Sequence, residues 1–177
     1  IWSRTYGGIG GSHWGNSVKE TSDGGYIIGA AQNTIIKTDS VGLEEWHQKL
    51  SYSVHHYVED VIQTSDGDYI VVGGAGGDPL GGHAIQGKAF ILRMSEGGGV
   101  QWIKRYGIID TPNNTFWGVV EADDGGFVLA GEKLQDRNFE FYDHFWVMKT
   151  DAYGDEEWSI ESGGNLWDAV SYTHLTL

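Results

Sequence analysis

The sequence predicts an all-β protein built from a repeated unit, and three observations support this prediction. Asp followed by Gly occurs as a turn signal at Asp23, Asp66 and Asp124, and glycine supplies the backbone conformation that tight hairpin turns need. A run of strand-forming residues follows each turn: YIIGA, YIVVGG and FVLAG. No apolar pattern of helical period extends beyond a turn or two.

One unit, read around residues 21–46, predicts four short strands joined mostly by tight turns. SVKET precedes the Asp23 turn and YIIGA follows it, and both are rich in strand formers. NTIIKTD gives a third strand, DSVG a second turn, and EEWHQKL an outer strand. In this outer strand Trp46, Gln48 and Leu50 share one face, because side chains alternate along a strand.

The outer-strand tryptophans have the same spacing in every copy. Trp46, Trp102 and Trp158 each follow a glycine by four residues. Such recurrence is expected of packing between units, so we expect these rings in the core. Units of about 40–50 residues with four strands indicate propeller blades. We therefore expect a fragment of a β-propeller with four-stranded antiparallel blades. The units span about 14–52, 57–107 and 115–162, with partial flanking blades, in one domain over residues 1–169.

The sequence also supports a prediction about each end of the chain. The opening IWSRTYGG matches the end of a unit, so we expect the chain to start inside a repeat. Residues 170–177, VSYTHLTL, resemble the translation of a transposase sequencing adapter over their whole length, and we expect a non-native tail there. The alternative is an ordinary inner strand, since the stretch WDAV at 167–170 fits the start of a unit.

Composition and charge exclude several classes of function. The 177 residues include no cysteine, which excludes disulfides, thiol nucleophiles and cysteine-based zinc sites. A net charge of −14 disfavours nucleic acid as a partner, and no apolar run is long enough for membrane insertion. We expect no cofactor and no metal, because the Asp-rich turns lack EF-hand spacing. His55 and His56 are adjacent on a predicted strand and would point to opposite faces.

The pattern DGGY, IIKTD, EEW and YGG resembles the tryptophan- and glycine-rich β-propeller repeats of secreted and cell-surface proteins of bacteria and archaea. The resemblance extends to about residue 169. It implies an extracellular or cell-surface location and a non-enzymatic scaffold or binding module, with the remaining blades of the full-length chain as partners. Ser95, where the other units have Asp, and two long inserts depart from the pattern.

The turn from Asp39 to Gly42, with Trp46, also resembles turns of two enzyme families. The tryptophan-docking turn of quinoprotein dehydrogenases is one residue longer, and the Asp-box of sialidases one residue shorter. Both families use the turn to hold blades together, so the likeness concerns structure and not chemistry. Sialidases need an arginine cluster, yet only Arg137 falls in a predicted loop. No catalytic set can be assembled, and the alternative is a propeller enzyme, hydrolase or quinoprotein-like, with its catalytic residues in other blades.

Connections between propeller strands alternate between two faces. The turns on one face are short and nearly identical, whereas the other face carries variable connections rich in His, Trp, Phe, Tyr and Asn, with inserts at 75–88 and 132–144. Variable aromatic loops on a rigid scaffold are where recognition usually occurs, so we expect a glycan or a protein to bind there. The alternatives are residues that only cap the centre of the ring, and inserts on which nothing depends. The candidate ligand-binding residues are His13, Trp14, His55, His56, Asn114, Phe116, Trp117, Phe141 and Tyr142.

Overall fold

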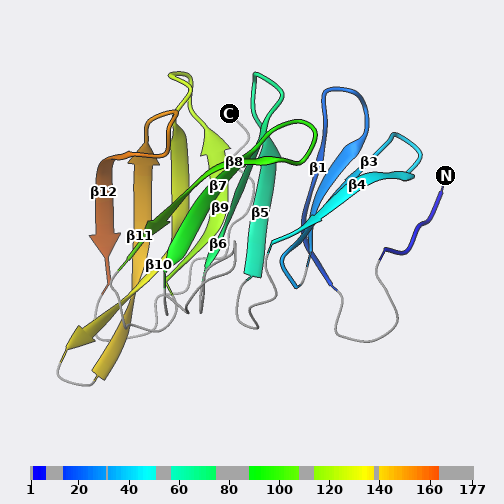
Figure 1. Cartoon of the computed structure of the whole chain (residues 1–177). Helices are drawn as coiled ribbons and strands as arrows, with labels where there is room; N and C mark the ends of the chain where they lie inside the picture. The colour runs from blue at the N-terminus through cyan, green and yellow to red at the C-terminus, as the bar shows by residue number, and fades with distance from the viewer. Residues whose placement is uncertain are drawn as a thin grey trace.

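The computed structural model describes residues 2–6, 14–30, 32–50, 57–74, 88–107, 114–137 and 140–163, with backbone alone for 134–143 (Figure 1). All regular structure in these ranges is β, in twelve strands, and none is helical. The chain is therefore all-β, as the sequence predicts. Residues 75–87 of the insert at 75–88 and the tail at 170–177 lie outside the described residues.

The strands form three antiparallel meanders of four, which are three propeller blades. The first blade is β1 (Gly15–Glu20), β2 (Tyr26–Ala30), β3 (Thr34–Thr38) and β4 (Glu44–Lys49). The second is β5 (Tyr57–Gln63), β6 (Tyr69–Gly74), β7 (Ala89–Met94) and β8 (Val100–Tyr106). The third is β9 (Thr115–Glu121), β10 (Phe127–Arg137), β11 (Glu140–Thr150) and β12 (Glu156–Ser162). A single bridge between Gly74 and Thr115 joins the second and third blades.

The blades stand side by side with their first strands inward. β1 contacts β5, and β5 contacts β9, while β4, β8 and β12 lie on the outer side of each blade. The short turns gather at one end of the arc, and the β10–β11 hairpin points to the opposite end (Figure 1). This hairpin contains the insert at 132–144, which extends the β10–β11 ladder out to the pair Arg137 and Glu140.

Two apolar cores fill the spaces between blades. β6 serves both: Tyr69 and Val71 pack in the core between the first and second blades, whereas Ile70 and Val72 pack in the core between the second and third. All four side chains are fully buried. A strand buried on both faces explains why YIVV reads as a continuous apolar run.

The two turns of each blade are built on side-chain caps. In the first, Asp23 Oδ1 accepts a hydrogen bond from the Gly25 N–H at 2.9 Å. In the second, Asp39 Oδ1 accepts from the N–H groups of Val41 and Leu43 at 2.9 and 2.8 Å. Ser95 takes the place of Asp39 in the second blade, and its Oγ accepts one such bond at 3.1 Å, from Gly99. The Ser95 hydroxyl therefore accepts one capping hydrogen bond where the Asp39 carboxylate accepts two.

Two outer-strand tryptophans, Trp46 and Trp102, each pack on a turn glycine of the following blade. A Cβ placed on Gly98 would lie 3.0 Å from the Trp46 ring, and one on Gly154 would lie 2.8 Å from the Trp102 ring. Both rings are partly buried against the cores, as the sequence predicts. Trp158 has the same register but is 46% exposed, because no described strand follows β12. The expectation of a core position is wrong for Trp158 in this chain.

A buried lysine holds the first turn to the outer strand. Lys37 of β3 has only 3% of its side chain exposed, and its Nζ lies 2.7 Å from Asp23 Oδ2 and 2.8 Å from Glu45 Oε2. The Lys37 ammonium lowers the pKa of Asp23 by hydrogen bonding. The third blade repeats the arrangement with Lys149, Asp124 and Glu157.

Candidate functional site

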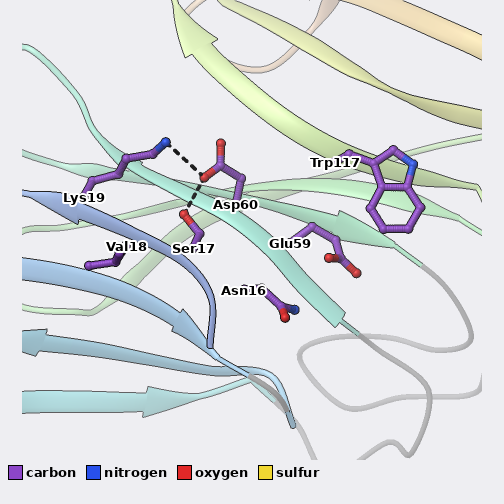
Figure 2. Close-up of a pocket in the computed structure, with 7 residues that line it drawn as sticks. All are labelled: Asn16, Ser17, Val18, Lys19, Glu59, Asp60 and Trp117. Carbon is purple, nitrogen blue, oxygen red and sulfur yellow. Dashed lines mark hydrogen bonds and ion pairs between the residues drawn. The ribbon is translucent and has the colours of Figure 1, made fainter. Parts of the chain in front are cut away.

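The candidate site is a hollow of about 370 Å³ on the inner strands β1, β5 and β9, where the three blades meet (Figure 2). Its lining comes from all three strands and is mostly polar. The lining residues are Asn16, Ser17, Val18, Lys19, Glu59, Asp60 and Trp117.

Each inner strand carries a β-bulge at the same position. In β1 the pairing with β2 passes from Gly15 to Ser17 and omits Asn16. The pairing of β5 omits Glu59 in the same way, and that of β9 omits Trp117. All three omitted residues lie seven positions before the Asp of the first turn. A bulge leaves one residue out of the ladder and re-aims its side chain, so the blades present an amide, a carboxylate and an indole at one equivalent position.

Glycine permits the close approach of strands at the bulges of β5 and β9, whereas Ala30 has the equivalent place beside the bulge of β1. Gly73 of β6 pairs with Val58 beside the β5 bulge, and a Cβ there would collide with the carbonyl oxygen of Tyr57. Gly131 of β10 has the same place beside the β9 bulge, against the carbonyl oxygen of Thr115. The backbone thus fixes the bulge and leaves the bulged side chain itself free to vary.

Asp60 forms the floor of the hollow and joins the three inner strands. It is 7% exposed, and its Oδ1 accepts from Ser17 Oγ on β1 at 2.5 Å. Its Oδ2 accepts from the Val119 N–H on β9 at 3.3 Å, and Lys19 Nζ lies 3.7 Å from Oδ1. Both carboxylate oxygens are therefore engaged in holding strands together, which makes Asp60 a structural residue of the site.

The bulged residues form the walls of the hollow. Asn16 Nδ2 donates to the Val58 carbonyl oxygen at 2.7 Å, which fixes the amide against β5. The Trp117 ring is 42% exposed. Partial burial raises the pKa of Glu59, and no side chain in the described ranges forms an ion pair or hydrogen bond with its carboxylate. Figure 2 shows the Asn16, Glu59 and Trp117 side chains around the same space.

The residues predicted from the sequence to bind a ligand lie in different environments in the structure: at the hollow, elsewhere on the surface, or in the core. Trp117 lines the hollow, and Trp14, just before β1, is 48% exposed but is not part of its lining. Phe116 is fully buried in the core between the second and third blades, with its ring 4.6 Å from that of Trp146. Asn114 is fully buried as well. The expectation of ligand contact is therefore wrong for Phe116 and Asn114, because both side chains are fully buried.

The remaining nominated residues are His13, His55 and His56, which lie outside the described residues, and Phe141 and Tyr142, whose backbone is in β11 but whose side chains are not described. The sequence prediction missed Asn16 and Glu59. Their equal distance from the turn Asp, shared with Trp117, is the signal that could have found them.

No group of three or more His, Cys, Asp and Glu side chains in the described ranges could hold a metal ion. A search of the same residues for a helix long and apolar enough to cross a membrane found none.

Comparison with known proteins gives only distant likenesses. No family model matches the chain, and neither does any curated protein. A protein of unknown function from Bacteroides caccae has a TM-score of 0.49 at 10% identity, over 84% of this chain and 61% of that one. BamB from Moraxella catarrhalis has a TM-score of 0.26 at 13% identity, over 85% and 66%. The chain thus spans less than two thirds of either protein, and the propeller architecture rests on the strand order and packing described above.

Proposed function

We propose that the chain is a non-enzymatic binding module of an extracellular or cell-surface protein, and that it binds a glycan in the hollow. One observation carries the proposal: three equivalent bulges direct an indole, an amide and a carboxylate to one space of about 370 Å³. Binding sites for small ligands have about this volume and combine an aromatic wall with a few placed polar groups. The resemblance of the repeats to those of secreted proteins supports the location.

The position of the bulges agrees with a site served by the variable connections. Asn16 is the second residue of β1, and Glu59 and Trp117 are the third residues of β5 and β9. The hollow therefore lies near the end of the inner strands where the chain arrives from the previous blade. Loops on a rigid scaffold commonly complete a binding site.

A glycan suits the hollow better than a protein surface does. Stable protein interfaces bury about 800 Å² on each partner, whereas the hollow is small and concave. A sugar presents an apolar ring face and hydroxyl groups together. The ring face can lie on the exposed indole of Trp117, and the hydroxyls can bond the free oxygens of Asn16 and Glu59.

Catalysis has less support from this geometry. Carboxylate pairs that cleave glycosides need two acidic groups facing the bond. Glu59 has Asp60 as its neighbour in the hollow, and both Asp60 oxygens are already held by Ser17, Val61 and Val119. The alternative, part of a propeller enzyme, has no observation in its favour among the described residues.

A glycan array with the 177-residue chain, followed by calorimetric titration of the oligosaccharides retained, tests the proposal. Trp117→Ala should weaken binding by about tenfold or more, because stacked rings contribute strongly to such sites. Tyr153→Ala is the matched control, since Tyr153 is 72% exposed on the opposite, short-turn end. Equal losses in both variants would contradict the assignment of the site. Cleavage products in the titrated mixture, seen by mass spectrometry, would support the enzyme alternative instead.

A further inference from the structure

Among the described residues, Glu59 leaves the hollow with a negative charge that no positive group compensates. Lys19 and Asp60 lie 3.7 Å apart and balance each other. No positive group in the described ranges pairs with Glu59, although the carboxyl is partly buried and its pKa is raised by that burial. A partly buried carboxylate without a partner is unfavourable, so an occupant that brings a positive charge gains more here than at the surface.

The indole beside Glu59 adds to this preference. Trp117 and Glu59 line the same hollow, and in the view of Figure 2 the Glu59 carboxylate lies to the lower left of the Trp117 ring. The face of a Trp ring attracts a cation, more strongly than Tyr or Phe does. An ammonium group in the hollow would therefore be favoured by both residues, while a carboxylate or phosphate would be disfavoured by Glu59 and by the net charge of −14.

We propose that the glycan bound in the hollow carries a free amino group, so that the ligand is an amino sugar whose ammonium pairs with the Glu59 carboxylate. This inference rests on the proposed function and narrows its ligand class. A methylated ammonium is a competing cation, but such groups are usually held in cages of several aromatic rings. The described lining has one aromatic ring, with Asn16 and Lys19 as polar neighbours, which suits a sugar ring with hydroxyl groups.

Two oligosaccharides that differ only at the amine provide the test: a glucosamine tetramer and its fully N-acetylated form, titrated into the 177-residue chain at about 0.15 M salt. The free amine should bind about tenfold or more tightly than the acetylated form. Glu59→Gln should remove that difference. The matched control is Glu96→Gln, which removes the same charge from the exposed β7–β8 turn and should leave the difference intact.

Each other outcome overturns the inference. If both tetramers bind equally and Glu59→Gln changes neither affinity, the amine preference fails while glycan binding stands. If Glu96→Gln reduces the free-amine affinity as much as Glu59→Gln, the attraction is one of net charge alone. If a lysine peptide binds and neither sugar does, the hollow recognises a protein. If the chain binds no glycan on the array either, the proposed function fails together with this inference.

Thermal stability provides a second readout that does not depend on ligand. Because burial raises the pKa of Glu59 in the folded state, the ionised carboxylate is penalised, and the penalty grows as the pH rises above the unfolded pKa of 4.5. Glu59→Gln should therefore raise the melting temperature at about pH 7 and have little effect near pH 4. A lower melting temperature at neutral pH would show that Glu59 already has a favourable partner.

Discussion

Replacement of Trp102 by Ala measures how much one docked tryptophan contributes to holding two blades together. The Trp102 ring packs on Gly154 of the next blade and against the core between the second and third blades. Trp158 is the matched control, since it has the same register in β12 but is 46% exposed. The two substitutions remove the same atoms, and they differ in whether the ring packs on a following blade in the described residues.

The expected magnitude follows from the buried area. A Trp side chain buries about 150–250 Å², which at about 25 cal/mol per Å² gives about 4–6 kcal/mol. Trp102 keeps part of its exposure, so we expect Trp102→Ala to lower the free energy of unfolding by about 3 kcal/mol. For Trp158→Ala, at an exposed position, we expect less than about 1 kcal/mol.

Urea unfolding followed by circular dichroism tests this difference, with thermal melts as a second measure. A loss of about 3 kcal/mol corresponds to about 6–12 °C in Tm for a chain of this size. The slope of the urea transition should not change, because both variants expose the same backbone on unfolding. Equal losses for the two variants, or a loss below about 1 kcal/mol for Trp102→Ala, would refute the docking of outer strands on following turns.

Three further substitutions test other parts of the structure. Asp23→Asn should lower the free energy of unfolding above about pH 5, because Lys37 holds the pKa of Asp23 down. The difference in free energy between the variant and the wild type should shrink as the pH falls below about 4. It should vanish below the depressed pKa of Asp23. A pH-independent difference in urea midpoints would contradict this. Gly73→Ala should lower the melting temperature, since its Cβ would meet the Tyr57 carbonyl oxygen, whereas Gly97→Ala has open space. Similar melting curves for the two variants would refute the bulge argument. Phe116→Ala should lower the free energy of unfolding by about 3–5 kcal/mol without changing glycan affinity. A loss of glycan affinity without a loss of stability would show that Phe116 contacts the ligand.

The blade architecture could be predicted from the sequence because its determinants are local and repeated. The turn at Asp23 needs only its own side chain and the glycine that follows it, and the same is true of Asp39 and Gly42. The partner of Trp46 was not predictable in the same way. Its spacing suggests Gly42 of its own unit, whereas the ring lies on Gly98 of the next unit. Spacing within a repeat shows that a position is constrained, but only the packing of blades shows which residue constrains it.

The site depends on a feature that alternation along a strand does not reveal. Two adjacent aromatics, Phe116 and Trp117, lie on opposite sides of β9, and a shift of one residue would exchange them. The bulge sets that choice, and it depends on a neighbouring strand through Gly131. The sequence therefore nominated both rings and missed Asn16 and Glu59, which have no aromatic or histidine character to draw attention.

Variation in the second blade shows what happens when a position has a structural task. There, Arg93 replaces the buried lysine, and its guanidinium bonds Asp66 and Asp68 at 2.5 and 2.8 Å. Asp68 stands where the other blades have Gly25 and Gly126, and Gln101 stands in place of the outer-strand glutamate and donates to Asp68 at 2.9 Å. Arg93, Asp68 and Gln101 thus replace the lysine, glycine and glutamate of the other blades. The ion pairs and hydrogen bonds at this turn are preserved with different residues.

The bulge position varies without any such compensation. Asn16 bonds the backbone of the neighbouring inner strand, but the carboxylate of Glu59 has no partner in the described ranges, and Trp117 remains 42% exposed. The backbone of the bulge is kept by Gly73 and Gly131, so the fold does not require a particular side chain there. A partly buried carboxylate without a partner in the described ranges and an exposed indole are not needed for folding, and substitutions would remove them easily if folding alone decided these positions. Their presence at one equivalent site, around one hollow, is better explained by a ligand than by the architecture of the blades.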